Sequence, residues 1–248
     1  ALLMEGSSLG CQGRECPDEI SVEKNMIEIM KREAGLCFLL CSSQNIDRIV
    51  SGFRAALQSD RVLVVDIYTA WILKIVSSVS SHIPVIEWEK VKVLSKGFTA
   101  GKHYGIVKSN PGYFGDFIHE LYKTDNVITM EEIKPNPRKY LIKTNYVSYL
   151  LKKIGMDHSS VIYSMWNGYL TKEHNPRSYK QYDDLKSNPL INFVHIHTSG
   201  HASVNHLKLL AEKLMPKKLI PIHTEHKEQY ADHFKNVHVL SDEIEISL

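Results

Sequence analysis

Short apolar runs alternate with segments of helical periodicity over the first 80 residues of the chain. Runs without polar positions are typical of strands that are covered on both faces of a sheet. Segments whose apolar residues recur every three or four positions indicate helices. Such an alternation predicts an α/β fold with a parallel sheet and flanking helices. The pattern predicts strands over residues 2–5, 36–40 and 62–65, and helices over residues 18–34, 45–57 and 68–79.

The middle of the chain, from about Pro84 to Pro137, is broken by glycine and proline, and we expect loops with short elements there. A clearer pattern returns after it. This pattern predicts strands over residues 140–142, 161–164, 193–197, 219–222, 237–240 and 244–248. It predicts helices over residues 146–154, 175–186, 203–214 and 227–234.

Asp66 follows the third predicted strand and precedes a predicted helix. Ligands of parallel sheets collect at the carboxyl ends of strands, so Asp66 is a candidate site residue. Aspartate is also a frequent N-cap, because its side chain accepts a hydrogen bond from the first turn. We favour the capping role.

The composition is that of an ordinary globular protein, with 43% hydrophobic and 23% charged residues, which excludes global disorder. The net charge of +2 is too small to indicate nucleic acid by itself. No run approaches the ~18 apolar residues of a membrane span, so no membrane partner is expected. The cysteines match no common zinc-binding spacing and indicate reduced thiols in a cytoplasmic protein. They are Cys11, Cys16, Cys37 and Cys41.

Histidines gather near the end of the chain, where predicted strands end. His195, His197 and His201 fall within seven residues, and His223 follows a later strand. Residues i and i+2 of a strand share a face, so His195 and His197 should point together. If the two strands are neighbours, their ends bring His197, Ser199, His201 and His223 into one cleft. Such imidazoles can bind zinc or transfer protons near neutral pH, and a purely structural set is the alternative.

Three segments resemble motifs of ribonuclease J and related β-CASP nucleases, including mRNA 3′-end-processing exonucleases. Residues 197–203 read HTSGHAS and resemble the family's HxSGHAS segment. Residues 221–225 read PIHTE and resemble the PVHGE segment that follows it. Residues 2–7 read LLMEGS and resemble a strand that ends in a glutamate before serine or threonine. The order and spacing of the three segments match across the chain.

The resemblance implies a domain organisation and an activity. Residues 11–160 correspond to a β-CASP-like insert, a parallel sheet with flanking helices. Residues 1–10 and 161–248 correspond to one strand and the C-terminal part of a metallo-β-lactamase αββα core. The implied activity is that of a zinc-dependent phosphodiesterase or ribonuclease on RNA or DNA, with two zinc ions in the intact parent protein.

The resemblance also implies residue roles. Glu5 matches an acidic residue that orients the catalytic histidine, and His201 matches that histidine. A carboxylate bonded to imidazole fixes its tautomer and raises its basicity. His223 matches a metal ligand, while His197 and Ser199 match groups beside the scissile phosphate. A surface acid at a strand end is the alternative for Glu5.

The sequence departs from the family in lacking the HxHxDH motif, which supplies other ligands of the family's metal site. His223 alone cannot hold a catalytic zinc, which takes three protein ligands. We therefore expect a fragment that is inactive by itself, with its other ligands on a missing N-terminal half. An uncovered apolar face would favour a homodimer. Thr224 stands where the family has glycine, which is expected to alter the local turn.

Two further substrate-binding candidates lie between the ends of the chain. Trp166, with Tyr169, could stack on a base, and core or hinge packing is the alternative. Arg138 could bind phosphate through its planar donors or lie on a solvated surface.

Three functions remain open at this point. The first is a metal-dependent nuclease, which the pairing of Glu5 with His201 favours. The second is a hydrolase of a small ester or lactam on the same fold. The third is a non-catalytic nucleic-acid-binding fragment, which the missing HxHxDH motif favours. Strong RNA binding by the chain separates the second function from the other two.

Overall fold

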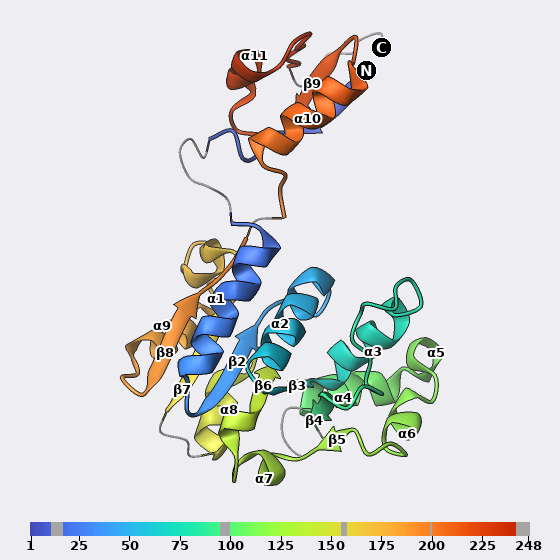
Figure 1. The fold of residues 1–248 in the computed structure, drawn as a ribbon, viewed down its shortest axis with the longest axis vertical. Coiled ribbons are helices and arrows are strands. Elements are labelled where there is room, and N and C mark those ends of the chain that lie inside the picture. Colours follow the sequence, from blue (N-terminus) through green and yellow to red (C-terminus); the bar gives the residue numbers. More distant parts are fainter. Residues whose placement is uncertain (11–16, 95–99, 155–157, 199, 242–248) are drawn as a thin grey trace. The chain divides into compact units, whose positions relative to one another are not determined.

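The computed structural model describes residues 1–10, 17–94, 100–154, 158–198 and 200–241. The chain forms two compact units, which are described separately (Figure 1). The large unit is Pro17–His197, and the small unit combines Ala1–Cys16 with Thr198–Leu248. Ser199, Cys11, Cys16 and the predicted strand over residues 244–248 lie outside the described residues.

A sheet of seven parallel strands forms the centre of the large unit, which confirms the predicted α/β class. The strands lie in the order β5-β4-β3-β6-β2-β7-β8. The chain therefore runs outwards from β2 to β5, returns with β6 between β3 and β2, and continues to β7 and β8 on the other side. The strands are β2 (Leu36–Leu40), β3 (Val62–Val65), β4 (Val91–Leu94), β5 (Val127–Ile128), β6 (Tyr140–Lys143), β7 (Ser159–Tyr163) and β8 (Ile191–His195).

Helices connect these strands and cover both faces of the sheet, as the alternating pattern predicts. The α-helices are α1 (Glu19–Arg32), α2 (Ile46–Gln58), α3 (Ile67–Val76), α4 (Ala100–Ser109), α5 (Pro111–Phe114), α6 (Phe117–Leu121), α7 (Met130–Ile133), α8 (Val147–Ile154) and α9 (Tyr179–Ser187). Two 3-10 turns are η1 (Pro137–Lys139) and η2 (Asn167–Leu170).

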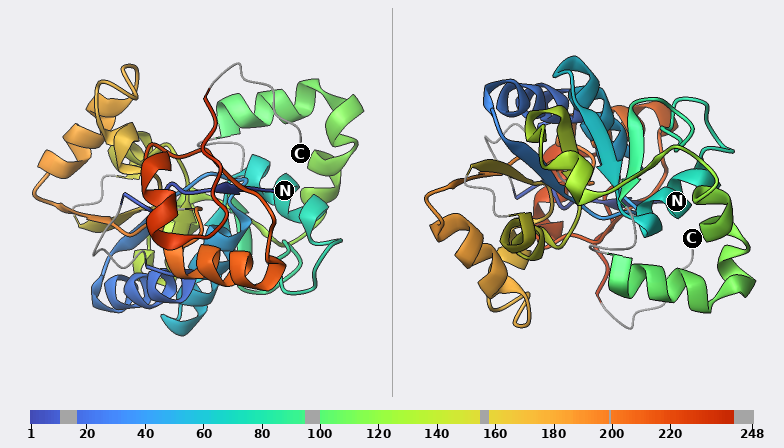
Figure 2. Two further views of the ribbon diagram at one scale, coloured as in Figure 1. Left: turned by 90° about the horizontal axis from the view of Figure 1, so that it is seen from above. Right: turned by 90° about the horizontal axis from the view of Figure 1, so that it is seen from below.

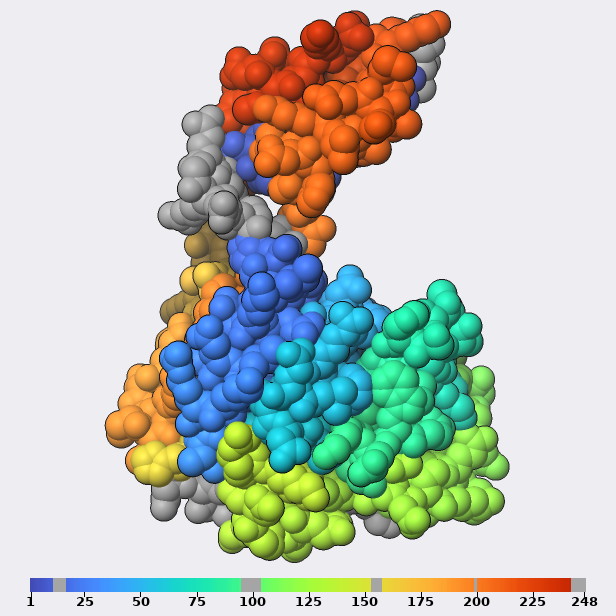
Figure 3. All heavy atoms as spheres, in the orientation of Figure 1, coloured from blue at the N-terminus to red at the C-terminus, as the bar shows by residue number. Residues whose placement is uncertain are grey.

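Two apolar cores lie against the two faces of the large sheet. In β2, Cys37 and Leu39 belong to the core with α1, α2 and α3, whereas Phe38 and Leu40 belong to the core with α8 and α9. Figure 2 shows α1 and α9 on opposite sides of the sheet, and Figure 3 shows the residues of α1, α2 and α3 side by side on one surface of the large unit. Burial on both faces explains why the strand is apolar at every position.

Side-chain caps begin the first three helices at Asp18, Asn45 and Asp66. Asp66 accepts a hydrogen bond from the Thr69 backbone N–H at 2.8 Å, which confirms its capping role. Its other carboxylate oxygen lies 3.2 Å from Nζ of the buried Lys143, which ends β6. The carboxyl ends of β3 and β6 are thus joined by a buried ion pair.

The region from about Pro84 to Pro137 consists of loops with short elements, as predicted, except for the longer helix α4. It includes β4, β5 and the helices α4 to α7. Helix α4 spans ten residues although it includes Gly105. Val107 of α4 is buried in the same core as Phe117 and Leu121 of α6. Burial in the tertiary fold therefore overrides the weak local helix propensity.

The small unit is built on a two-stranded parallel sheet of β1 (Leu2–Glu5) and β9 (Leu219–Ile222). Helix α10 (Val204–Leu214), the 3-10 turn η3 (Lys227–Gln229) and helix α11 (Tyr230–His233) complete it. Met4, Leu207, Leu219 and Tyr230 belong to its buried core. The Tyr230 hydroxyl donates to the backbone oxygen of Met4 at 2.7 Å, so α11 is tied directly to β1.

Several sequence predictions need correction. The strand predicted over residues 193–197 is β8, which pairs with β7 in the large sheet and is not a neighbour of β9. Residues 237–240 form only an isolated bridge, between Val237 and Leu219. Residues 161–197 lie in the large unit, which does not by itself test the predicted bounds of the insert and the hydrolase core. The assignment of the units to an insert and a hydrolase core stays a prediction.

The two described cysteines, Cys37 and Cys41, are buried free thiols, as predicted. Burial raises the pKa of Cys37 to about 12 and that of Cys41 to about 11, so both thiols stay protonated at neutral pH. Among the described residues, no helix has the length and apolar character needed to span a bilayer.

Candidate functional site

Glu5, His201 and His223 come together in the small unit, at the carboxyl ends of its two strands. Glu5 is the register partner of Ile222, so His223 follows directly at the same edge of the sheet. His201 lies just before Ser203, the N-cap of α10. Ligand atoms of Glu5, His201 and His223 all lie within 4.8 Å of one another. The three residues that the motifs predict as functional therefore form one cluster.

The Glu5 carboxylate is held on both of its oxygens. Oε1 accepts the backbone N–H of Ala202 at 2.8 Å, and Oε2 accepts that of Ser7 at 2.9 Å. Oε2 also lies 3.3 Å from Nδ1 of His201. The side chain is 25% exposed, so it is neither a core residue nor a freely solvated acid. Glu5 is therefore a partly exposed acid at a strand end whose carboxylate is held in place by hydrogen bonds.

The pKa of Glu5 is lowered from its ordinary value. Burial by itself raises this pKa, but the hydrogen bonds from Ser7 and Ala202 and the nearby His201 together outweigh burial. These donors stabilise the charged form of the carboxyl group. Glu5 is therefore a carboxylate at neutral pH and can act as a hydrogen-bond acceptor for His201.

The contacts of His223 indicate which of its ring nitrogens is protonated. The Ser7 hydroxyl donates to the backbone oxygen of His223 at 3.0 Å, and the same Oγ lies 3.1 Å from Nδ1 of the ring. A hydroxyl has one proton but can also accept hydrogen bonds. Because the hydroxyl proton is donated to the carbonyl, Oγ accepts a hydrogen bond from Nδ1–H, and the lone pair of Nε2 is left for a metal ion.

Thr224 is accommodated in the turn after β9. The residue with the left-handed backbone conformation in this turn is His223, whose φ is 48°, and not Thr224. The Thr224 hydroxyl donates to the backbone oxygen of Gly6 at 3.0 Å and accepts the His226 N–H at 3.1 Å. Threonine at this position therefore ties the turn to the end of β1.

The rings of His201 and His223 stack with centroids 5.1 Å apart.

The cluster fits a divalent metal ion in its donor chemistry. Two imidazoles and one carboxylate form a set that zinc takes in catalytic sites. Both oxygens of Glu5, however, already accept hydrogen bonds, and one lies beside His201. This favours His223 as the metal ligand and Glu5 as the residue that orients His201.

His197 lies in the large unit, where the buried Arg48 approaches it. Arg48 Nη1 is 3.3 Å from Nδ1 of His197. Burial, then Arg48 and His195, lowers the pKa of His197 to about 4, so its ring is neutral at physiological pH. The rings of His195 and His197 lie 5.8 Å apart, which agrees with their predicted common direction.

The other predicted residues occupy separate places. Ser199 lies outside the described residues. Arg138 lies at the amino end of β6 and donates to the backbone oxygen of Ser59 at 3.2 Å. Trp166 lies beyond the carboxyl end of β7 and is 50% exposed. The proposed roles of these residues stay predictions.

Sequence reasoning missed the buried arginine of α2. The Arg48 side chain pairs with Glu19 at 2.8 Å and donates to the backbone oxygen of Ser164 at 3.2 Å. In sequence, Arg48 looks like a polar position of an amphipathic helix, and no local signal marks it as buried. It links the start of α1 with the connections that follow β7 and β8.

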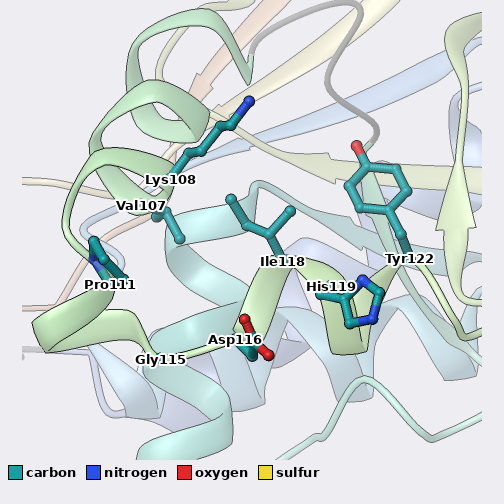
Figure 4. A pocket seen from close by; sticks show the side chains of 8 residues that line it. All are labelled: Val107, Lys108, Pro111, Gly115, Asp116, Ile118, His119 and Tyr122. Atoms are coloured by element: carbon teal, nitrogen blue, oxygen red, sulfur yellow. The ribbon is translucent and has the colours of Figure 1, made fainter.

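A surface pocket of about 350 Å³ lies among α4, α5 and α6 of the large unit (Figure 4). Lys108, Asp116, His119 and Tyr122 contribute polar groups, and Val107 and Ile118 contribute apolar ones. None of the residues predicted from the sequence lines it. Glu5, His201 and His223 are not among the residues that line this pocket.

Comparison with known proteins supports a metal-dependent hydrolase. Residues 191–243 match the family described as the Zn-dependent metallo-hydrolase RNA specificity domain (RMMBL). This segment includes β8, α10 and β9, and with them His201 and His223. The match supports an RNA-specificity domain of a Zn-dependent metallo-hydrolase over these residues. A search of curated proteins found no match.

The fold is similar to that of a protein of unknown function from Enterococcus faecalis V583, known from a crystal structure. The two chains are 21% identical, with a TM-score of 0.66. The similarity covers 98% of this chain and 50% of the other chain. This chain therefore spans about half the length of the protein to which its fold is similar.

Proposed function

We propose that this chain contributes one part of the active site of a zinc-dependent phosphodiesterase that cleaves RNA. The observation that carries the proposal is the Glu5–His201–His223 cluster at two adjoining strand ends. The RNA-specificity family match over residues 191–243 supports RNA over a small ester or lactam as substrate. DNA remains an alternative polymer, and a direct comparison of labelled RNA and DNA distinguishes the two.

In this proposal Glu5 and His201 act as a pair. The Glu5 carboxylate holds the proton on Nδ1 of His201, 3.3 Å away, and so fixes the tautomer of the ring. With a further proton on Nε2, His201 donates that proton to the leaving oxygen as the P–O bond breaks. Water forms the new P–O bond and releases one proton to the solvent. The Nε2 proton of His201 can hydrogen-bond a phosphate oxygen before cleavage.

His223 would hold the metal ion through Nε2. When bound, zinc supplies an activated water and neutralises charge on the phosphate oxygens. Three protein ligands are usual for such a zinc, and the sequence has no HxHxDH motif. We therefore propose that the remaining ligands come from another polypeptide segment, either a missing hydrolase half or a second copy of the chain. His197 and Ser199, which match groups beside the scissile phosphate, stay proposed contacts to the substrate, and Arg138, at the amino end of β6, stays a separate proposed phosphate contact.

A non-catalytic RNA-binding module is the second candidate. The absence of the HxHxDH motif favours it, because His223 is left as the single metal ligand when Glu5 and His201 act as a pair. Both candidates predict RNA binding. They differ in whether His201 and Glu5 affect the cleavage of RNA.

The test is RNA cleavage by the protein purified from its source together with any polypeptide that accompanies it. Labelled single-stranded RNA is incubated with and without added zinc, and cleavage is compared for wild type and His201→Ala. We expect cleavage to require metal and to fall at least 100-fold in the variant, within the range for losing a general acid. RNA affinity should change by less than about threefold. Cleavage that is insensitive to both changes would contradict the proposal.

A further inference from the structure

The connection between β7 and α9 presents two aromatic side chains to solvent. Trp166 is 50% exposed and Tyr169 is 47% exposed. The exposure of Trp166 differs from that expected for core packing, since tryptophan is highly buried on average. An exposed indole next to an exposed phenol therefore calls for a partner that uses their rings.

The two rings are arranged at right angles. The ring centroids of Trp166 and Tyr169 are 5.4 Å apart, and the ring planes meet at 88°. His174 contacts Trp166 from a centroid distance of 4.8 Å at an angle of 59°. Edge-to-face packing of this kind holds aromatic rings in place beyond their buried area.

Gly168 allows the indole to lie against the backbone of the turn. A Cβ added at Gly168 would lie 2.2 Å from ring atoms of Trp166. The turn is also held by hydrogen bonds: the Trp166 backbone oxygen accepts from the Tyr163 hydroxyl at 3.1 Å, and Asn175 Nδ2 donates to the Tyr169 oxygen at 2.9 Å. The rings are thus placed before any ligand binds, which lowers the entropic cost of binding.

The same connection is rich in cations. Three exposed cations follow the two rings in the sequence, Lys172 and Arg177 in the connection and Lys180 in the first turn of α9, against the single carboxylate of Glu173. Exposed aromatic rings next to cations are the combination that binds single-stranded nucleic acid, with bases on the rings and phosphates on the charges. An apolar protein partner would instead match aliphatic neighbours.

We propose that Trp166 and Tyr169, supported by Gly168, form a stacking platform for unpaired nucleobases of RNA. The choice of RNA rests on the proposed function, but binding at the platform requires neither metal nor cleavage. The platform predicts a preference for single-stranded over double-stranded RNA, because paired bases do not expose their faces.

The experiment measures binding of a fluorescently labelled, unstructured oligoadenylate RNA to the chain by anisotropy, without metal. Trp166→Ala should weaken binding about 5- to 150-fold, the factor expected for one lost base–aromatic stack. Trp166→Phe should retain part of the affinity. Tyr113→Ala, which removes an 82% exposed ring from α5, is the matched control and should bind as wild type does.

Gly168→Ala tests the placement of the ring without removing it. The added methyl group must displace the indole, so RNA affinity should fall although both aromatic residues remain. Gly112→Ala is its control, because an added Cβ there meets no atom within 4 Å. Circular dichroism of each variant reports whether the fold is kept. A variant that unfolds is replaced by Tyr169→Ala, which removes the second ring alone.

The outcomes separate this inference from the proposed function. Wild-type binding that is lost in Trp166→Ala and kept in Tyr113→Ala supports the platform. Equal binding of Trp166→Ala and wild type overturns the platform but leaves RNA cleavage through His201 untouched. Equal affinity for single- and double-stranded RNA also overturns it. An intact chain that binds no RNA overturns the platform, whereas the proposed function fails only when metal-dependent cleavage is absent or insensitive to His201→Ala.

Discussion

The Glu5 carboxylate lies 3.3 Å from Nδ1 of His201, although the two residues are 196 positions apart in the chain. The parallel pairing of β1 with β9 and the turn before α10 bring them together. Both residues belong to the small unit, so the pair is defined within one compact part of the molecule. The motifs at the two ends of the chain therefore contribute the two side chains of one interacting pair.

Replacement of Glu5 by glutamine should slow RNA cleavage more than it weakens RNA binding. Glutamine keeps the shape of the side chain but removes the charge that stabilises a protonated His201. We expect kcat to fall about 10- to 100-fold, with KM changed by less than about threefold. Steady-state kinetics measures both, and Glu225→Gln, which alters an exposed neighbour, is the control. Equal losses in the two variants would argue against a specific pair.

Gly6 should not tolerate a side chain. A Cβ at this position would lie 2.5 Å from the ring of Tyr230, which is fully buried and hydrogen-bonded to Met4. Gly6→Ala should therefore destabilise the small unit by about 1–3 kcal/mol, as expected for overpacking. Gly105→Ala in α4 meets no atom within 4 Å and should be neutral or stabilising by up to about 1 kcal/mol. Urea denaturation compares the two variants, and equal stability would contradict the packing described.

Removal of the buried Arg48 should destabilise the large unit. Arg48→Met fills similar space but removes the Arg48 donors to the Ser164 backbone oxygen and to the Glu19 carboxylate, which keeps the Ser51 hydroxyl as a donor. We expect a loss of about 2–4 kcal/mol in the free energy of unfolding, in the range for broken buried ion pairs. Arg54→Met removes a half-exposed arginine of the same helix and should cost less than about 1 kcal/mol. Comparable losses from the two changes would show that burial of Arg48 adds no stability.

The low pKa of His197 makes a prediction about the pH dependence of stability. The folded-state pKa is about 4, below the ordinary value of 6.5, because burial and then Arg48 and His195 disfavour the charged ring. The unfolded chain therefore binds a proton first as the pH falls. The contribution of the neutral His197 ring to the free energy of unfolding is fully present above pH 6.5, and it is lost progressively as the pH falls to about 4.

The variant His197→Asn removes this titration and keeps a side-chain acceptor for Arg48. Urea denaturation between about pH 7 and pH 4 should show a shallower decline in stability for the variant than for wild type. His82→Asn, at an exposed position, is the control and should follow wild type. Parallel curves for wild type and His197→Asn would contradict the pKa assignment.

The sequence predicts the alternating elements well where one local signal decides the structure. Asp66 caps α3 as its position before an apolar helix indicates, and the apolar run over residues 36–40 is β2 within the bounds expected. Helix α4 was not predicted, because Gly105 obscures the pattern and the burial of Val107 stabilises the helix from outside its own sequence.

The candidate site could be predicted from the sequence in part, because local motifs identify its residues. Motifs at the two ends of the chain predict the identities of Glu5, His201 and His223, but only the pairing of β1 with β9 shows that these residues meet. The placement of β8 was wrong, because the short apolar strand fits either sheet and its partner is set by long-range pairing. Arg48 was missed, since a buried arginine has the sequence signature of a surface residue.

In the proposed function His223 is a metal ligand, and the remaining ligands come from another polypeptide segment; such an incomplete metal site is called a half-site here. Its most direct test is zinc binding by the purified chain, measured by elemental analysis and by titration against a chromophoric chelator. We expect near-zero zinc after purification and reversible binding of added zinc that is weaker than in a three-ligand site. This binding should be lost in His223→Ala but not in His82→Ala. Zinc binding that is unchanged in His223→Ala would contradict the role of this residue. Two zinc ions per chain that survive dialysis would contradict the half-site and would mean that the chain holds a complete metal centre.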